Sequence, residues 1–356
     1  MARRKNKHGP DLSYRTLYIG GGTPSRLHPE ECLALFEMLA QVFPQRAWEE
    51  ITYELNPEDL DIYPDYPRWL QACGVSRISL GTQTTSAQGL KVLERQTRPQ
   101  QVLESVAKVR QAFKGSLSLD LIIGWPGQKV EMLTNDDLPF LSQALPDHLS
   151  IYMLNVEPGT KLERDRRQGK IELLDDDTSA SIWETLLTYM EEAGFEHYEI
   201  SNFCKKGHES LHNTLTWRGH DYLGIGTGAV SRMGITRWTN VANPDVYIKK
   251  TTEGRWPVAS AEAIVPEVAW KECLLLSLRH HEGLRLSSFQ QRFRDPLPQK
   301  FWHSLTLGQD QGDLSLENNV LKFTPQGWSR FDAWLSDWML ILDEAAVKAV
   351  GRGWGH

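Results

Sequence analysis

The chain has 356 residues, of which 40% are hydrophobic and 24% charged, and its formal net charge at pH 7 is −7. This composition is ordinary for a globular protein, and the acidic balance disfavours nucleic acid as a partner. The apolar runs are shorter than a transmembrane helix, and the basic N-terminus lacks the apolar core of a signal peptide. The four cysteines are too scattered for a zinc or disulfide framework. We therefore expect a cytoplasmic protein.

Strand and helix patterns alternate along the first 200 residues, which predicts βα units around a parallel sheet, either closed as a barrel or open. The expected strands are Thr16–Ile19, Ile51–Leu55, Arg77–Leu80, Leu117–Ile123, Leu149–Leu154 and Tyr198–Ile200. The expected helices are Pro29–Phe43, Tyr66–Ala72, Ser86–Glu94, Pro99–Phe113, Asn135–Ala144 and Thr178–Ala193.

The pattern changes after this α/β region, which we assign to residues 1–240. Lys205–Thr239 is rich in glycine, histidine and aromatic residues and is expected to form long loops. Residues 241–257 are expected to be a linker, 258–342 a small helical domain with a β-wing, and 343–356 a tail. Winged-helix-like folds often bind DNA, but this one has no basic stripe, so we expect it to pack or to bind a partner protein.

A glycine turn follows the first expected strand, at Gly20-Gly21-Gly22-Thr23. Glycine lets the backbone approach a ligand without a Cβ in the way, and a strand, a glycine turn and a helix in sequence can cradle a polar ligand. The sequence has neither the G-x-G-x-x-G pattern nor a Walker lysine at this turn. On this pattern alone, a purely structural strand-to-helix turn is the better interpretation.

Polar residues stand where the other strands end, and loops converge on one face there. Glu54, Gln83 and Asp120 lie within or just after apolar strands, and Arg95 closes the helix that follows Gln83. Each could be satisfied structurally, by an ion pair, a helix cap or a buried hydrogen bond. An acid inside an apolar strand is nonetheless costly unless something binds it. Together the four would suit a ligand that carries an amine, a carboxylate and a ribose.

Several motifs along the chain resemble radical SAM enzymes of the coproporphyrinogen III dehydrogenase (anaerobic oxidase) group. They are Ile19–Ser25, Glu54–Pro57, Arg77–Gln83, Asp120–Gln128, Ser150–Leu154, Glu157–Thr160 and Leu274–Arg279 with Glu282-Gly283. The resemblance implies a (β/α)6 barrel. It also implies that Gly20, Gly21, Gly22 and Thr23 bind the methionyl amine end of S-adenosylmethionine, and that Glu54, Gln83, Arg95 and Asp120 contact the rest of that cofactor.

Within that group, Leu211–Trp217 is similar to the His-Asn-x-x-Tyr-Trp segment of the heme chaperones called HemW, with Thr216 in place of the tyrosine. The resemblance implies that His212 ligates heme iron, that Asn213 orients its ring, and that Trp217 lies against the porphyrin. Without the resemblance, a histidine satisfied within a loop is the better interpretation. His208 is a weaker alternative ligand, and Val230 replaces a histidine usual in relatives.

One departure concerns the iron–sulfur cluster that radical SAM chemistry requires. Such clusters are held by a Cys-x-x-x-Cys-x-x-Cys loop before the glycine turn, but the residues before Gly20 include no cysteine. We therefore expect an incomplete barrel without its first βα unit, no cluster, and only weak residual binding of S-adenosylmethionine. Truncation, or a start codon placed too late, is the preferred explanation over adapted loss.

The sequence thus predicts a heme chaperone that binds heme and transfers it to an acceptor protein, for which a membrane protein is one candidate. An oxygen-independent coproporphyrinogen III oxidase is the first alternative, and a clusterless scaffold without catalysis is the second. The histidine segment and the missing cluster cysteines favour the chaperone over the oxidase. Whether any catalysis remains is left open by the sequence.

Overall fold

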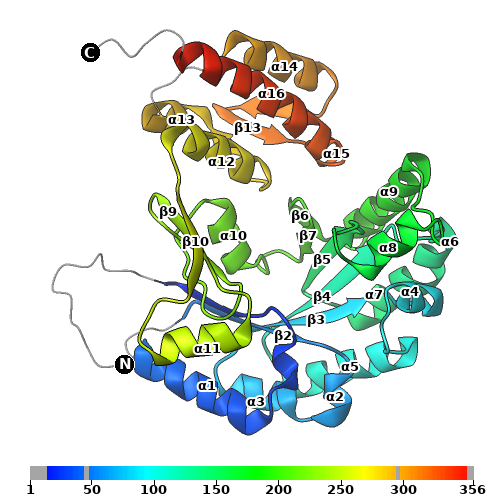
Figure 1. Cartoon of the computed structure of the whole chain (residues 1–356). Helices are drawn as coiled ribbons and strands as arrows, with labels where there is room; N and C mark the ends of the chain where they lie inside the picture. Colours follow the sequence, from blue (N-terminus) through cyan, green and yellow to red (C-terminus); the bar gives the residue numbers. More distant parts are fainter. Residues whose placement is uncertain (1–13, 44–47, 294–296, 351–356) are drawn as a thin grey trace. The chain divides into compact units, whose positions relative to one another are not determined.

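The computed structural model describes residues 14–43, 48–293 and 297–350 (Figure 1). It divides the chain into two compact units, Arg15–His212 and a second unit made largely of the chain from Asn213 onward. The boundary falls inside one helix, α10 (Leu211–Trp217). Each unit is described by itself below.

The first unit is built on a seven-stranded sheet of order β1-β2-β3-β4-β5-β7-β6. The first five strands run parallel and follow the order of the chain, as βα units require. Their bounds are β1 Thr16–Ile19, β2 Glu50–Leu55, β3 Arg77–Gln83, β4 Ser116–Ile123 and β5 His148–Met153. The predicted parallel α/β sheet is therefore confirmed, and it is open.

The end of this sheet differs from the prediction. A single last strand was expected at Tyr198–Ile200, but the structure has a tight pair, β6 (Glu196–Glu199) and β7 (Asn202–Cys204). Strand β7 lies between β5 and β6 and is antiparallel to both. A chain that reverses within two residues can pair only antiparallel, so the sheet is mixed at this edge.

The two faces of the sheet have opposite character. Strand side chains alternate between faces, and one set is apolar and buried under helices in a single core. The helices of this unit are α1 Pro29–Val42, α2 Asp59–Ile62, α3 Tyr66–Ala72, α4 Ala87–Val92, α5 Pro99–Ala112, α6 Val130–Met132, α7 Leu138–Ala144, α8 Lys161–Arg167 and α9 Asp176–Glu192, with a π-helical turn, Leu133–Asp137, before α7. The other set of strand side chains is polar, and it is this face that carries the candidate site.

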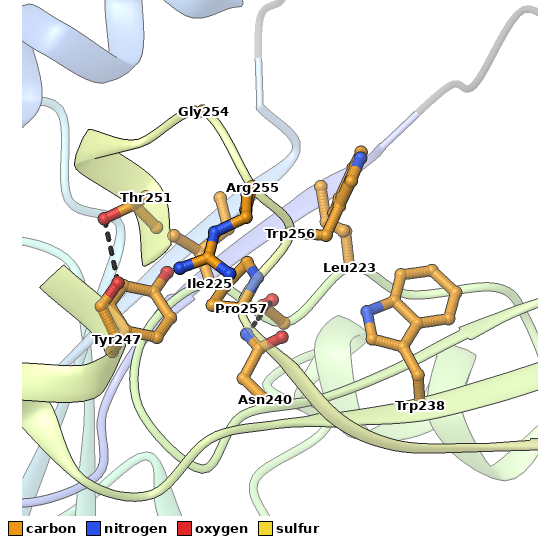
Figure 2. A pocket seen from close by; sticks show the side chains of 11 residues that line it. Leu223, Ile225, Trp238, Asn240, Tyr247, Thr251, Gly254, Arg255, Trp256 and Pro257 are labelled. Carbon is orange, nitrogen blue, oxygen red and sulfur yellow. Dashed lines mark hydrogen bonds between the residues drawn. The ribbon is translucent and has the colours of Figure 1, made fainter. Parts of the chain in front are cut away.

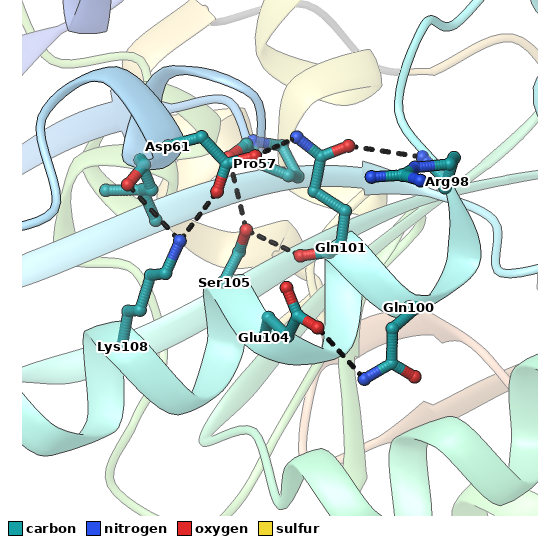
Figure 3. Close-up of polar contacts among 9 residues, drawn as sticks. Pro57, Asp61, Arg98, Gln100, Gln101, Glu104, Ser105 and Lys108 are labelled. Carbon is teal, nitrogen blue, oxygen red and sulfur yellow. Dashed lines mark hydrogen bonds and ion pairs between the residues drawn. The ribbon is translucent and has the colours of Figure 1, made fainter.

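Polar contacts hold helix α5 against the segment that follows β2 (Figure 3). Lys108 Nζ lies 2.6 Å from an Asp61 carboxylate oxygen, and Gln101 Nε2 donates to the other oxygen at 2.5 Å. The Ser105 hydroxyl donates to the Pro57 carbonyl at 3.2 Å. These contacts fix the chain directly after the strand end that carries Glu54.

The second unit contains a small antiparallel sheet of order β10-β9-β8. The strands are β8 Val230–Met233, β9 Thr236–Asn240 and β10 Val258–Ala263, and helix α11 (Pro244–Thr252) connects the last two. The prediction of long loops over Lys205–Thr239 is wrong, since this stretch contains α10, β8 and β9. The segment 241–257, expected to be a linker, joins two paired strands of one unit.

The remaining elements form a winged-helix arrangement with a three-stranded sheet of order β11-β13-β12. The helices α12 (Pro266–Leu278) and α13 (Leu286–Phe293) and the hairpin of β12 (Leu314–Glu317) and β13 (Val320–Phe323) lie within residues 258–342, where helices and a β-wing were expected. The remaining elements are β11 Leu284–Arg285, α14 Gln299–Asp310, α15 Pro325–Trp328 and α16 Phe331–Val350. Helix α14 was not predicted. No helix among the described residues is long and apolar enough to cross a membrane.

Candidate functional site

The polar face of the sheet is set by the register of its parallel strands. Glu54 on β2 pairs with Ser79 on β3, and Asp120 on β4 pairs with Ser150 on β5. Asp120 also accepts hydrogen bonds from the Ser79 hydroxyl, at 2.9 Å to each of its oxygens. The two acids that the sequence singled out therefore lie on the same face of the sheet, on β2 and β4, the two strands that flank β3.

The glycine turn wraps around the carboxylate of Glu54. The backbone N–H of Gly21 donates to one oxygen at 3.0 Å, and the Tyr18 hydroxyl donates to the other at 2.7 Å. A Cβ on Gly20 would lie 2.6 Å from the Glu54 carboxyl carbon and 2.5 Å from the Tyr18 ring, so only glycine fits. Gly21 and Gly22 have φ values of 78° and 68°, which favour glycine.

Asp120 is the acid whose ionisation is most altered at this site. Burial raises its pKa to about 6, and the nearby Glu54 carboxylate adds to the rise, while hydrogen bonds from Ser150 and Ser79 oppose it. A carboxyl group with this pKa ionises near neutral pH and gains from a cationic or hydrogen-bond-donating ligand. The pair can thus bind an ammonium group or ribose hydroxyls.

Gln83 and Arg95 are the other two side chains predicted to contact S-adenosylmethionine. Gln83 ends β3 with φ of 62°, and its amide lies beside Gly81, where an added Cβ would be 3.1 Å away from Nε2. Arg95 is half-buried, and the described residues show no ion pair to its side chain. The structure brings Glu54, Asp120 and the glycine turn together, whereas the ligand contacts of Gln83, Arg95 and Thr23 remain predictions.

His212 lies in helix α10 and not in the loop that was expected. Its Nδ1 is 3.0 Å from the Thr16 hydroxyl, and its ring centroid is 5.0 Å from that of Tyr18. Thr16 on β1 thus contacts the ring, and the orienting role expected of Asn213 remains a prediction. The ring is half-buried, and burial lowers the pKa of His212 while the Glu50 carboxylate opposes this, so the neutral imidazole is favoured.

Glu50 secures the start of the helix that carries His212. Its carboxylate accepts hydrogen bonds from the backbone N–H groups of Leu211 and His212, each at 2.9 Å, and from the Ser210 hydroxyl at 3.4 Å. An anion at a helix N-terminus satisfies orphan donors and the positive end of the dipole. The sequence analysis did not identify Glu50 or Thr16. For Glu50, the available signal was an acidic residue at the start of an apolar strand.

Trp217 and His208 have contacts of their own in the structure, and their expected roles toward heme remain predictions. Trp217 is five residues after His212, which on a helix separates their directions by about 140°. The guanidinium of Arg279 lies 5.5 Å from the Trp217 ring centroid, so a cation already covers part of this indole. His208, the alternative ligand, has its Nδ1 at 3.4 Å from the Ser116 hydroxyl and its carbonyl bonded to Arg77.

The cysteines do not form a cluster-binding set. Cys32 donates to the Tyr53 hydroxyl at 3.7 Å within the core, and Cys204 is buried in β7. In the part of the chain that the structure describes, the one group of three metal-type ligands is His280, His281 and Glu282, and both Glu282 oxygens accept from Arg218. The four thiols therefore do not fit a cluster held by three cysteines, and no chemistry is derived through one.

Two family models match the chain: "Radical SAM superfamily" over residues 3–136 and "HemN C-terminal domain" over residues 264–330. The chain is similar to proteins named heme chaperone HemW. It is 32% identical to that of Bacillus subtilis, over 89% of this chain and 83% of the relative, and 32% identical to that of Lactococcus lactis, over 88% and 82%. The relative from Mycobacterium tuberculosis is 35% identical, over 76% of this chain and 69% of the relative.

A solved structure of coproporphyrinogen III oxidase (HemN) from Escherichia coli resembles this one with a TM-score of 0.76, over 91% of this chain and 77% of that chain. Its sequence identity is 20%, so the likeness establishes the fold alone. The incomplete radical SAM barrel and the C-terminal helical domain expected from the sequence agree with this match.

Proposed function

The chain belongs to the HemW family of the radical SAM superfamily, and from that premise we propose that it binds heme and passes it to an acceptor protein. Heme is the cargo in this proposal, not a resident cofactor. We place the activity in the cytoplasm, and the acceptor includes membrane proteins among its candidates.

The observation that carries the proposal is the contact between Thr16 and the imidazole of His212. Histidines that ligate metal through one ring nitrogen usually hydrogen-bond through the other, which sets the tautomer and the ring direction. Here Nδ1 faces the Thr16 hydroxyl at 3.0 Å, and we assign ligation of the iron to Nε2. Burial lowers the pKa of His212, so no proton has to leave before iron binds at pH 7.

A chaperone must also release its cargo. A single imidazole from a half-buried helix suits moderate affinity, because an enclosed pocket would retain heme. The second residue of the segment that we assign to heme is Trp217, whose indole Nε1 has no hydrogen-bond partner among the described residues. Since Trp217 and His212 diverge on their helix, we propose that the indole meets the edge of the macrocycle and not the face that His212 approaches.

The family implies S-adenosylmethionine and a 4Fe–4S cluster. The residues present fit the first: Glu54 and Asp120 would hold its amine and ribose, and the Gly20–Gly22 turn provides close backbone approach. When bound, that cofactor supplies a sulfonium that radical chemistry cleaves. Because the thiols do not fit a cluster, we propose binding without cleavage, and the oxidase alternative gains no support from this chain.

The experiment that tests the function is a titration of the purified chain with hemin, followed by mixing with apomyoglobin. We expect a saturable shift of the Soret band, and then transfer of the bound heme to the globin. The absence of any Soret shift in the wild-type chain would remove the chaperone assignment.

A further inference from the structure

A cavity of about 310 Å³ lies in the second unit, between the small β-sheet, helix α11 and the loop before β8 (Figure 2). Neither His212 nor any residue predicted to bind S-adenosylmethionine lines this cavity. The cavity is partly open to solvent, and its size is at the lower end of the range for small-molecule sites.

The cavity wall is mainly apolar and aromatic. In the view of Figure 2, the indole rings of Trp238 and Trp256 stand on one side, and Tyr247 and Arg255 on the other. Trp256 is 76% exposed and Ile225 is 65% exposed, an unusual amount of large apolar surface beside a cavity. Flat aromatic walls favour a flat apolar ligand.

The cavity is held in shape by hydrogen bonds. Asn240 Nδ2 donates to the carbonyls of Gly226 at 3.0 Å and Gly224 at 3.3 Å, and the Tyr247 hydroxyl accepts from the Gly226 N–H at 3.0 Å. These bonds tie the loop to β9 and α11. A wall fixed in this way is preformed, which reduces the ordering cost of binding.

Arg255 gives the cavity its charge. Its guanidinium pairs with Glu253 through Nη2, and both side chains are exposed. A guanidinium has five N–H donors, so pairing with Glu253 leaves donors for a second carboxylate. The ligand chemistry indicated is therefore a flat aromatic ring system that carries a carboxylate.

We propose that this cavity receives one edge of a porphyrin, with a propionate on Arg255 and the ring edge between Trp238 and Trp256. The choice of porphyrin over another aromatic acid rests on the proposed function. A cavity of about 310 Å³ encloses only part of a macrocycle, which suits a protein that must release it.

The test uses metal-free protoporphyrin IX, which imidazole cannot ligate, titrated into the full chain and followed by porphyrin fluorescence. We expect saturable binding that weakens at least tenfold in Trp256→Ala and roughly fivefold in Arg255→Gln. His212→Ala should bind as the wild type does. Leu340→Ala and Arg285→Gln, which change an exposed leucine and an exposed arginine outside the cavity, are the matched controls and should be neutral.

Three outcomes would overturn the inference: no saturable binding, equal effects of the cavity and control variants, or loss of binding in His212→Ala. A further arm uses 2-naphthoate, a smaller aromatic acid. If 2-naphthoate binds in an Arg255-dependent manner and protoporphyrin does not, the porphyrin assignment is wrong. A normal hemin Soret shift in the same preparation separates each of these failures from failure of the proposed function.

Discussion

The hydroxyl oxygen of Thr16 lies 3.0 Å from Nδ1 of His212, a contact across 196 positions of the chain. It joins the first strand of the sheet to the helix that carries the candidate heme ligand. Tyr18, on the same face of the same strand, packs against the His212 ring. The sheet thus supplies two contacts to the His212 ring, from Thr16 and Tyr18.

Thr16→Val should weaken heme binding roughly tenfold, because the ring loses the hydrogen bond that orients it while the volume is kept. Thr16→Ser keeps the hydroxyl and should bind almost as the wild type does. Hemin titrations followed at the Soret band measure the affinities. Equal affinity in Thr16→Val and the wild type would contradict this role.

His212→Ala should remove or shift the Soret band of the heme complex, since the imidazole is the proposed ligand. His208→Ala is the control: its side chain bonds to Ser116, and we expect a smaller change. Absorption and electron paramagnetic resonance spectra of the ferric complex report the ligand directly. An unchanged spectrum in His212→Ala would refute the ligand assignment but not the family.

Glu50→Ala should lower the free energy of unfolding by about 2–4 kcal/mol, because two backbone N–H groups of helix α10 lose a buried acceptor. Glu50→Gln retains one acceptor oxygen and should cost about 1 kcal/mol. Urea denaturation provides the measurement.

The neighbouring Glu49 offers a matched control, since its ion pair with Arg15 is exposed. Glu49→Ala should change stability by less than about 1 kcal/mol. If Glu49→Ala and Glu50→Ala are equally stable, Glu50 does not cap the helix.

The free energy of unfolding of Asp120→Asn, relative to that of the wild type, should increase as pH rises. The folded pKa of Asp120, about 6, is above the ordinary value of 3.8, so the folded state holds its proton while the unfolded state has lost it. Wild-type stability therefore declines between about pH 4 and 6, by at most about 3 kcal/mol from this group.

Urea unfolding of both proteins from pH 4 to 7 tests this sign, since groups common to both cancel in the difference. A difference that does not change with pH would show that Asp120 titrates normally.

Binding of S-adenosylmethionine should be weak, with Kd in the range of about 0.1–1 mM, because the amine and carboxylate lack the cluster iron that anchors them in the family. Asp120→Ala should abolish it in calorimetry. Tight binding that Asp120→Ala leaves unchanged would count against the site, and formation of 5′-deoxyadenosine would contradict the proposal of binding without cleavage.

Local chemistry in the sequence was sufficient for the parallel sheet. The predicted first strand, Thr16–Ile19, has the observed bounds, and β2 to β5 begin within one residue of their predictions. Alternating apolar side chains and turn residues carry this information within a few positions, so no distant contact is needed. The same reasoning placed Glu54 and Asp120 at one edge, because parallel strands in chain order present their ends together.

Residues 205–239 lack that periodicity, and the prediction of long loops there was wrong. Helix α10 is only seven residues long, too short to be stable by propensity, and it exists because Glu50 caps it from a strand 160 positions earlier. The direction of the His212 ring likewise depends on Thr16. The resemblance of its motifs thus indicated the family and the candidate ligand-binding residues. Which of them meet, and through which atoms, was decided by contacts between distant segments that only the folded chain brings together.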